Sequence, residues 1–112
     1  YESAPQLFSK LEKDRFNPDE SSHMQVRQLM DCDLLIVDDL GTEMPGNFVT
    51  AALYSLVNDR LLSRKATVIS TNLNIAEIAQ RYSPQIASRL QGSFKGLTFV
   101  GQDIRVLKNR GF

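Results

Sequence analysis

Two adjacent carboxylates directly follow a continuous apolar stretch of the sequence. Residues 34–37 are all aliphatic, and Asp38 and Asp39 come next. Such a run is typical of a strand in a parallel sheet, and open parallel sheets bind ligands beyond the carboxyl ends of their strands. There Asp38 would hold Mg²⁺ through water, and Asp39 would orient or deprotonate a water molecule that attacks a phosphoryl group. The alternative is that the two acids act as turn formers or helix caps.

A second polar group follows the next β-branched run. Residues 67–71 predict another buried strand, which Asn72 ends. If the two strands are neighbours, the Asn72 amide lies beside the two acids, where it can donate to a γ-phosphate oxygen and accept from the attacking water. Asparagine also ends strands simply as a turn residue, so both interpretations stay open.

Arg89 is the third candidate. It falls in a helix predicted over residues 84–91, among apolar neighbours such as Ala87 and Leu90. A guanidinium spreads positive charge over the oxygens of a transferring phosphoryl group, so Arg89 could serve as an arginine finger for a nucleotide in a neighbouring subunit. The alternative is a solvated arginine on a helix surface.

The elements that would position these residues alternate along the chain. Apolar spacing and capping residues predict helices over residues 4–15, 23–31, 47–64, 74–82 and 84–91, the last of them ended by Gly92. Strands are predicted over residues 34–37, 67–71 and 97–100, with a loop over 17–22 and a polar tail over 103–112. This order indicates an α/β fold with a parallel sheet whose aliphatic strands are buried on both faces.

Length and composition restrict the class of protein. The 112 residues suffice for one domain, and 42% hydrophobic with 23% charged residues exclude a disordered tail, a collagen-like repeat and a coiled-coil rod. The formal net charge of zero argues against non-specific coating of nucleic acid, although residues 1–40 carry nine acids and only four bases. No apolar run could span a membrane, no signal peptide is visible and the lone Cys32 fits a reducing compartment, so we expect a cytoplasmic protein without a membrane partner.

Four segments together resemble one ATPase family in order and spacing. Residues 33–43 are similar to the Walker B region of the DnaC/DnaI-type helicase loaders and of the related IstB transposition ATPases. Residues 70–73 resemble their sensor 1, residues 86–90 their arginine-finger helix, and residues 101–105 their sensor 2 region. The resemblance covers nearly the whole chain and is more specific than any single motif.

The resemblance implies a parallel-sheet AAA+ P-loop ATPase core that uses ATP and Mg²⁺ to place a replicative helicase on DNA. Asp38 would hold the metal ion, Asp39 would be the catalytic carboxylate, and Asn72 would be sensor 1. Arg89 would act in trans as the arginine finger, and Arg105 would contact the nucleotide as sensor 2. The implied partners are the replicative helicase, further copies of the chain joined through the Arg89 face, and single-stranded DNA.

A DNA contact would need basic residues along a groove between subunits. Arg60, Arg64, Lys65 and Arg81 could supply them, but solvated helix faces explain these residues equally well. Aromatic residues that could stack on bases are not evident near them in the sequence. DNA binding therefore follows from the resemblance alone.

The chain departs from the family in lacking a Gly-x-x-x-x-Gly-Lys-Ser/Thr loop to cradle phosphates. In the family, the strand before this loop lies between the second and third strands predicted here. Residues 1–112 would then form a partial AAA+ domain, running from after the family's second strand to the sensor 2 region, with a gap in its sheet. We therefore expect a piece of a longer protein that binds ATP weakly by itself, which leaves open whether the chain alone is an enzyme.

Three other functions remain open beside the helicase loader. An IstB-like transposition helper would use the same core. A non-catalytic AAA+-like interaction module would keep the fold without ATP turnover, although the complete set of Asp38, Asp39, Asn72 and Arg89 speaks against a degenerate site. A metal-dependent phosphohydrolase built on the two aspartates would need more metal ligands than the single histidine adds.

Overall fold

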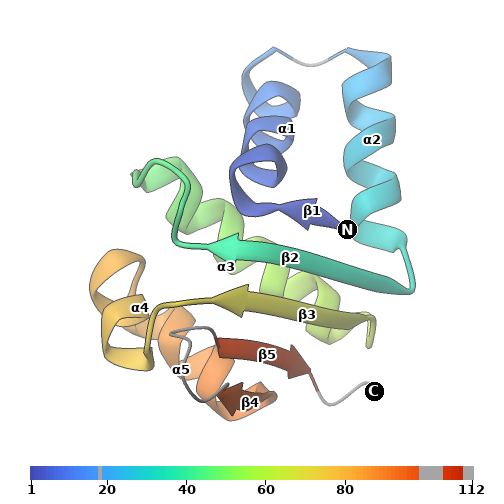
Figure 1. Cartoon of the computed structure of the whole chain (residues 1–112). Helices are drawn as coiled ribbons and strands as arrows, with labels where there is room; N and C mark the ends of the chain where they lie inside the picture. The colour runs from blue at the N-terminus through green and yellow to red at the C-terminus, as the bar shows by residue number, and fades with distance from the viewer. Residues whose placement is uncertain (18, 99–104, 110–112) are drawn as a thin grey trace.

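The computed structural model of the chain describes residues 1–17, 19–98 and 105–109, with side chains up to residue 94. The described strands are β1 (Glu2–Ser3), β2 (Leu34–Leu40), β3 (Ala66–Thr71), β4 (Phe94–Thr98) and β5 (Arg105–Asn109). The described helices are α1 (Ala4–Phe16), α2 (Glu20–Asp31), α3 (Asn47–Leu62), α4 (Ile75–Arg81) and α5 (Pro84–Ser93) (Figure 1). The α/β class predicted from the sequence is confirmed.

The described strands form one mixed sheet in the order β1-β2-β3-β5-β4. β1, β2 and β3 are parallel, and Val37 in the middle of β2 pairs with Glu2 on one side and with Ile69 on the other. β5 runs antiparallel to both of its neighbours, β3 and β4. The predicted parallel sheet is therefore limited to three strands.

β5 occupies the position at which the sequence predicts a gap in the sheet, so the predicted gap is absent from the described strands. β4 runs in the same direction as β3, and β5 lies between the two and pairs with both. Residues 105–109 belong to the predicted polar tail, so that prediction is wrong for this stretch. Of the predicted strand 97–100, the last two residues lie outside the described part of the chain. The pairing satisfies main-chain groups of β3 and β4 that would otherwise lack partners inside the sheet.

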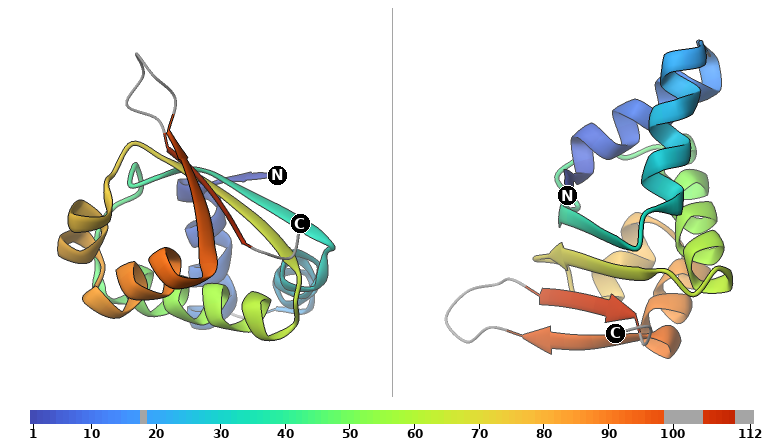
Figure 2. Two further views of the ribbon diagram at one scale, coloured as in Figure 1. Left: turned by 90° about the horizontal axis from the view of Figure 1, so that it is seen from below. Right: turned by 90° about the vertical axis from the view of Figure 1, so that its right-hand side faces the viewer.

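The described helices lie on one side of the sheet (Figure 2), where α1 packs against β2, α3 against β3 and α5 against β4. Burial follows this arrangement with a period of two: Val37 and Ile69 face the helices and are buried, whereas Ile36 and Val68 on the other face are only half-buried. Leu34, at the start of β2, is 45% exposed. The prediction that these strands are buried on both faces is therefore wrong within the described residues.

Local capping starts the helices largely as the sequence predicts. Asn74 and Glu77 form a capping box ahead of α4, and the Ser83 side chain caps α5. α2 begins three residues earlier than predicted because the Asp19 side chain caps it, which shortens the predicted loop. At its other end α5 continues through Gly92, which was expected to end it.

The buried guanidinium of Arg60 lies at the amino ends of β2 and β3. Arg60, near the end of α3, is 1% exposed and donates to the Thr67 hydroxyl (2.8 Å) and to the Ala66 carbonyl (2.7 Å). It also donates to the carbonyls of Met30 (2.9 Å) and Leu29 (3.3 Å), at the end of α2, where the helix itself supplies no donor. We call Arg60 and these acceptors the Arg60 cluster. Since Arg60 lies in the interior, both interpretations that the sequence offered for it, a DNA contact and a solvated helix face, are wrong.

Candidate functional site

Asp38 and Ser70 meet near the carboxyl ends of β2 and β3, on the face of the sheet that the described helices leave open. The Ser70 hydroxyl donates to Asp38 Oδ1 (2.5 Å), and the Tyr1 hydroxyl donates to Oδ2 of the same carboxylate (2.6 Å). These hydrogen bonds, that from Ser70 first and that from Tyr1 second, hold the pKa of Asp38 below its ordinary value. Asp38 is therefore an ionised, half-buried carboxylate at the end of a parallel strand.

A β-bulge keeps both aspartates away from the helix-covered face. β2 pairs Val37 with Ile69 but Leu40 with Thr71, so it holds one residue more than β3 between these pairs. In regular alternation Asp39 would share the buried face with Val37. Instead Leu40 takes that place and is fully buried, while Asp39 is exposed with a φ of +59°. The bulge thus lets two consecutive acids avoid the core.

The Ser70 hydroxyl and a tight turn fix the main chain of Asp39. Ser70 Oγ accepts from the Asp39 N–H (2.9 Å) while it donates to the preceding carboxylate. The Asp39 carbonyl accepts from the Thr42 N–H (3.2 Å) and from the Thr42 hydroxyl (2.8 Å). Gly41, inside this turn, has a φ of +109°, and a Cβ there would lie 2.9 Å from Leu73 Cδ1, so the turn requires glycine.

Glu43 follows the turn and is the one buried carboxylate among the residues with described side chains, at 5% exposure. Its Oε1 accepts from the Gly41 N–H (2.9 Å), and its Oε2 accepts from the Tyr82 hydroxyl (2.6 Å) and from Arg81 Nη2 (3.1 Å). Burial, and then the contact with Glu43, raise the pKa of Tyr82. We call these four residues the Glu43 cluster. Sequence reasoning assigned Glu43 no role, because its partners at the end of α4 are 38 and 39 residues away and no local pattern connects them.

Two further predicted site residues fall at the same edge of the sheet. Asn72 is exposed and directly follows Thr71, which pairs with Leu40 of β2. Thr71 also pairs with Arg105, so the backbone of Arg105 lies at this edge on the other side of β3. The side chain of Arg105 lies outside the described part of the chain.

Arg89 belongs to a different part of the molecule. It is exposed on α5, on the helix-covered side, where Asn58 and then Arg89 hydrogen-bond the Tyr54 hydroxyl and lower its pKa. Arg89 and Tyr54 line a groove of about 620 Å³ that is built from α3 and α5 and includes none of the strand ends. The structure therefore brings Asp38, Asp39 and Ser70 together but does not bring Arg89 to them within one chain.

The oxygen donors at the strand ends suit Mg²⁺ better than a metal that needs a full protein cage. Among the residues with described side chains, no three His, Cys, Asp or Glu groups lie close enough to form such a cage. Mg²⁺ is commonly held by one or two carboxylates together with water and phosphate oxygens. Two adjacent carboxylates and the Ser70 hydroxyl supply the protein's share of that set. These residues are oxygen donors of the kind that a magnesium ion takes.

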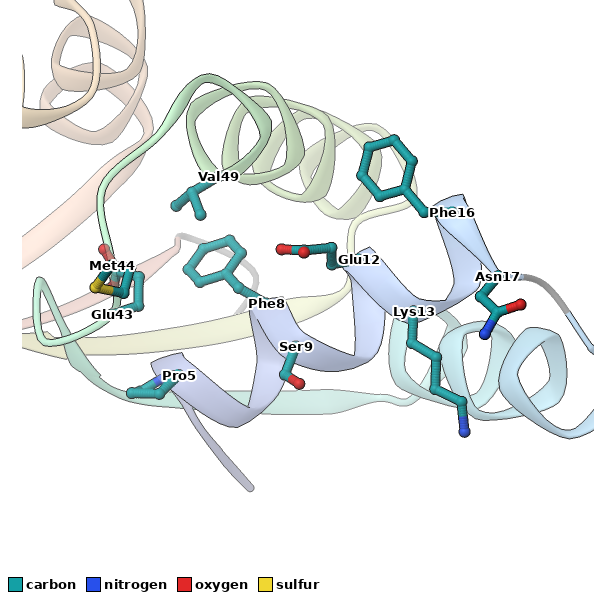
Figure 3. Close-up of a pocket in the computed structure, with 10 residues that line it drawn as sticks. All are labelled: Pro5, Phe8, Ser9, Glu12, Lys13, Phe16, Asn17, Glu43, Met44 and Val49. Atoms are coloured by element: carbon teal, nitrogen blue, oxygen red, sulfur yellow. The ribbon is translucent and has the colours of Figure 1, made fainter.

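A groove of about 500 Å³ lies between α1, the loop after β2 and the start of α3 (Figure 3). Phe8 and Val49 line its apolar part, and the exposed Met44 lies at its rim. The Glu12 carboxylate points into the groove, whereas Lys13 points away from it (Figure 3). Neither of the two adjacent aspartates lines this groove, so it is separate from the candidate site at the strand ends.

None of the helices in the described part of the chain combines the length and the apolar character that crossing a bilayer requires. No family model, curated protein or solved structure matches the chain.

Proposed function

We propose that this chain belongs to the AAA+ ATPase core of a helicase-loader-type DNA replication factor, in which Asp38 and Asp39 act on Mg²⁺-bound ATP. The observation that carries the proposal is the β-bulge at the end of β2. It presents two consecutive carboxylates, outside the core, at the edge where open parallel sheets bind their ligands. The resemblance to the helicase loaders supplies the identity of that ligand.

Asp38 is suited to hold the metal ion. Its lowered pKa keeps the carboxylate ionised, and two neutral hydroxyls orient it without cancelling its charge. Mg²⁺ bound there would neutralise negative charge on the phosphate oxygens. Ser70 would keep the Asp38 carboxylate in a single orientation, as hydrogen-bonding partners of metal ligands commonly do.

Asp39 is suited to act on water. Its carboxylate is exposed, whereas its main chain is held by Ser70 on one side and Thr42 on the other. A carboxylate carried by a main chain that is held in this way can orient a water molecule and accept its proton during attack on a phosphoryl group. Asn72, at the same edge, can donate to a phosphate oxygen.

The proposal extends to an assembly of several copies with a replicative helicase and single-stranded DNA. The exposure of Arg89 supports it, because an arginine finger acts on the nucleotide of a neighbouring copy and need not approach its own Asp38. Of the basic residues considered for DNA, Arg64 is exposed, whereas Arg81 is engaged with Glu43. The helicase and the DNA are proposed as partners only because the sequence resembles that of the helicase loaders.

Mg²⁺-dependent ATP turnover of a longer chain that includes a phosphate-binding loop tests the proposal, because residues 1–112 contain no such loop. Asp39→Asn removes the carboxylate but keeps the bulge, because asparagine tolerates left-handed backbone. We expect turnover to fall by at least about 100-fold with ATP binding retained. The matched control is Asp33→Asn, which neutralises a fully exposed carboxylate just before β2, at its amino end. Equal turnover in the two variants would contradict the role of Asp39.

One observation favours a non-catalytic interaction module as the second candidate. Both oxygens of Asp38 already accept hydrogen bonds from hydroxyl groups, which satisfies the carboxylate without a metal ion. Calorimetric titration with ATP, with and without Mg²⁺, separates the two functions. A catalytic site requires binding that strengthens with Mg²⁺ and weakens in Asp38→Asn, whereas a module predicts no difference between these conditions.

A further inference from the structure

The Glu43 cluster is a buried polar network next to the proposed catalytic turn. A buried carboxylate is costly unless it is paired and hydrogen-bonded. Glu43 meets both conditions, since Arg81 neutralises its charge and each of its oxygens accepts at least one hydrogen bond. Arg81 also donates to the main-chain carbonyl of Glu43. Both the side chain and the main chain of Glu43 are therefore fixed.

One end of the network holds the turn that carries Asp39. Glu43 Oε1 accepts from the Gly41 N–H, and the Asp39 carbonyl accepts from Thr42, so two sets of hydrogen bonds close residues 39–43. Both Asp39 and Gly41 have positive φ, a backbone state that is costly for the aspartate and needs support from its surroundings. Glu43 supplies part of that support.

The other end of the network holds the junction between α4 and α5. Arg81 is the last residue of α4, Tyr82 follows it, and Ser83 caps α5. α5 also carries Arg89. A single carboxylate thus connects the turn of Asp39 with the base of the helix that bears the proposed arginine finger.

We infer that Glu43 is a positioning residue, which holds Asp39 in its catalytic orientation and ties that orientation to the placement of α5. The inference rests on the proposed function, because Asp39 must act on water for its orientation to affect a rate. Glu43 is buried and already bonded to Gly41, Arg81 and Tyr82, so we do not assign it a contact with the nucleotide. Its effect passes through Gly41 to the turn on one side and through Arg81 and Tyr82 to α5 on the other.

Glu43→Gln tests the inference with two independent measurements. Glutamine keeps the shape of the side chain but removes its charge, so the hydrogen bonds to Gly41 and Arg81 weaken. Exchange of the Thr42 amide hydrogen reports closure of the turn without any nucleotide, and we expect it to be about tenfold faster in the variant. Steady-state ATP turnover should show kcat reduced by about 10- to 100-fold with KM changed far less.

The matched control is Glu12→Gln, an exposed carboxylate on α1, which should change neither measurement. Unchanged Thr42 exchange in Glu43→Gln would overturn the inference, as would a lowered melting temperature with kcat per folded molecule unchanged. A different outcome is faster Thr42 exchange in Glu43→Gln together with no Mg²⁺-dependent turnover in a longer wild-type chain that includes a phosphate-binding loop. It would contradict the proposed function but not the effect of Glu43 on the turn.

Tyr82→Phe provides a milder variant if Glu43→Gln does not fold. It removes one donor to Glu43 Oε2 and leaves the bond to Gly41 in place. We expect the same two changes at smaller size. If Tyr82→Phe has the Thr42 exchange rate and the kcat of the wild type, the proposed coupling of α5 to the turn through Glu43 is contradicted.

Discussion

Arg60 and Asp38 lie at opposite ends of the same pair of strands and use their charges differently. At the amino ends, Arg60 is sealed from water and donates to main-chain carbonyls of α2 and β3 and to a hydroxyl. At the carboxyl ends, Asp38 is half-buried with two hydroxyl partners, and Asp39 beside it is exposed. The charge of Arg60 is used entirely in hydrogen bonds that join α2, α3 and β3. The charges of Asp38 and Asp39 remain accessible at the surface.

The hydrogen-bond partners of Arg60 and of the two aspartates indicate what each charge contributes to the protein. A buried charge without an opposite charge is tolerated only when every donor has an acceptor, and removing it leaves those acceptors unsatisfied. Folding should therefore depend strongly on Arg60. Asp38 and Asp39 keep contact with water, so the fold should depend on them only weakly, and a ligand can still use their charge.

The largest effect should follow removal of Arg60. Arg60→Met keeps most of the side-chain volume but leaves the Met30 carbonyl without its donor and removes the bonds to Ala66 and Thr67, so we expect a loss of about 3 kcal/mol in the free energy of unfolding. Urea denaturation measures it. Arg64→Met is the matched control, because Arg64 is exposed four residues away, and it should cost less than about 0.5 kcal/mol. Similar losses in both variants would remove the contrast between the two ends of the strands.

A smaller effect is expected at the carboxyl end. Ser70→Ala removes the hydroxyl that joins Asp38 to the Asp39 N–H, and we expect a loss of about 1 kcal/mol in the free energy of unfolding. The same urea experiment measures this change. A loss as large as that of Arg60→Met would mean that the acids and Ser70 form a structural unit, which would weaken the proposed site.

The smallest effect is a pH dependence carried by Asp38. Its folded pKa lies below the ordinary value of 3.8, so the ionised form contributes stability above that value, and the contribution is lost as the pH falls through the lower folded pKa. We expect the stability difference between wild type and Ser70→Ala to shrink from about pH 5 downward. Carboxyl ¹³C chemical shifts of Asp38 in the two proteins provide the check, with a higher titration midpoint in the variant. Identical midpoints would show that Ser70 does not control this carboxylate.

Local sequence patterns predict the elements and the position of the two acids well. The capping residues Asn74 and Ser83 act through neighbours three residues along the chain, so their effect can be derived from the sequence alone. The aliphatic run before Asp38 likewise identifies a strand and its carboxyl end. Neighbouring parallel strands end at the same edge, so the pattern also predicts a polar residue of the second strand beside the acids. It assigns this place to Asn72, whereas the structure shows Ser70 in contact with Asp38 and with the Asp39 N–H.

Features that depend on distant partners could not be predicted in this way. The bulge at Asp38 and Asp39 results from the register with β3, and the burial of Glu43 and Arg60 results from partners about 30 to 40 residues away. Nothing in the composition of residues 105–109 distinguishes an interior antiparallel strand from a polar tail. The sequence also did not predict that one face of the sheet is only half-buried. An aliphatic run is typical of a strand covered on both faces, but it does not show whether helices pack on both.

The left-handed backbone at Asp39 restricts how this position can change during evolution. Glycine adopts a φ of +59° without steric cost, so a glycine there would relieve strain and leave the fold at least as stable. It would also remove the carboxylate. A lineage that no longer required chemistry at this edge would therefore drift towards glycine or asparagine at position 39. A lineage selected for that chemistry keeps the acid and accepts a slightly less stable protein.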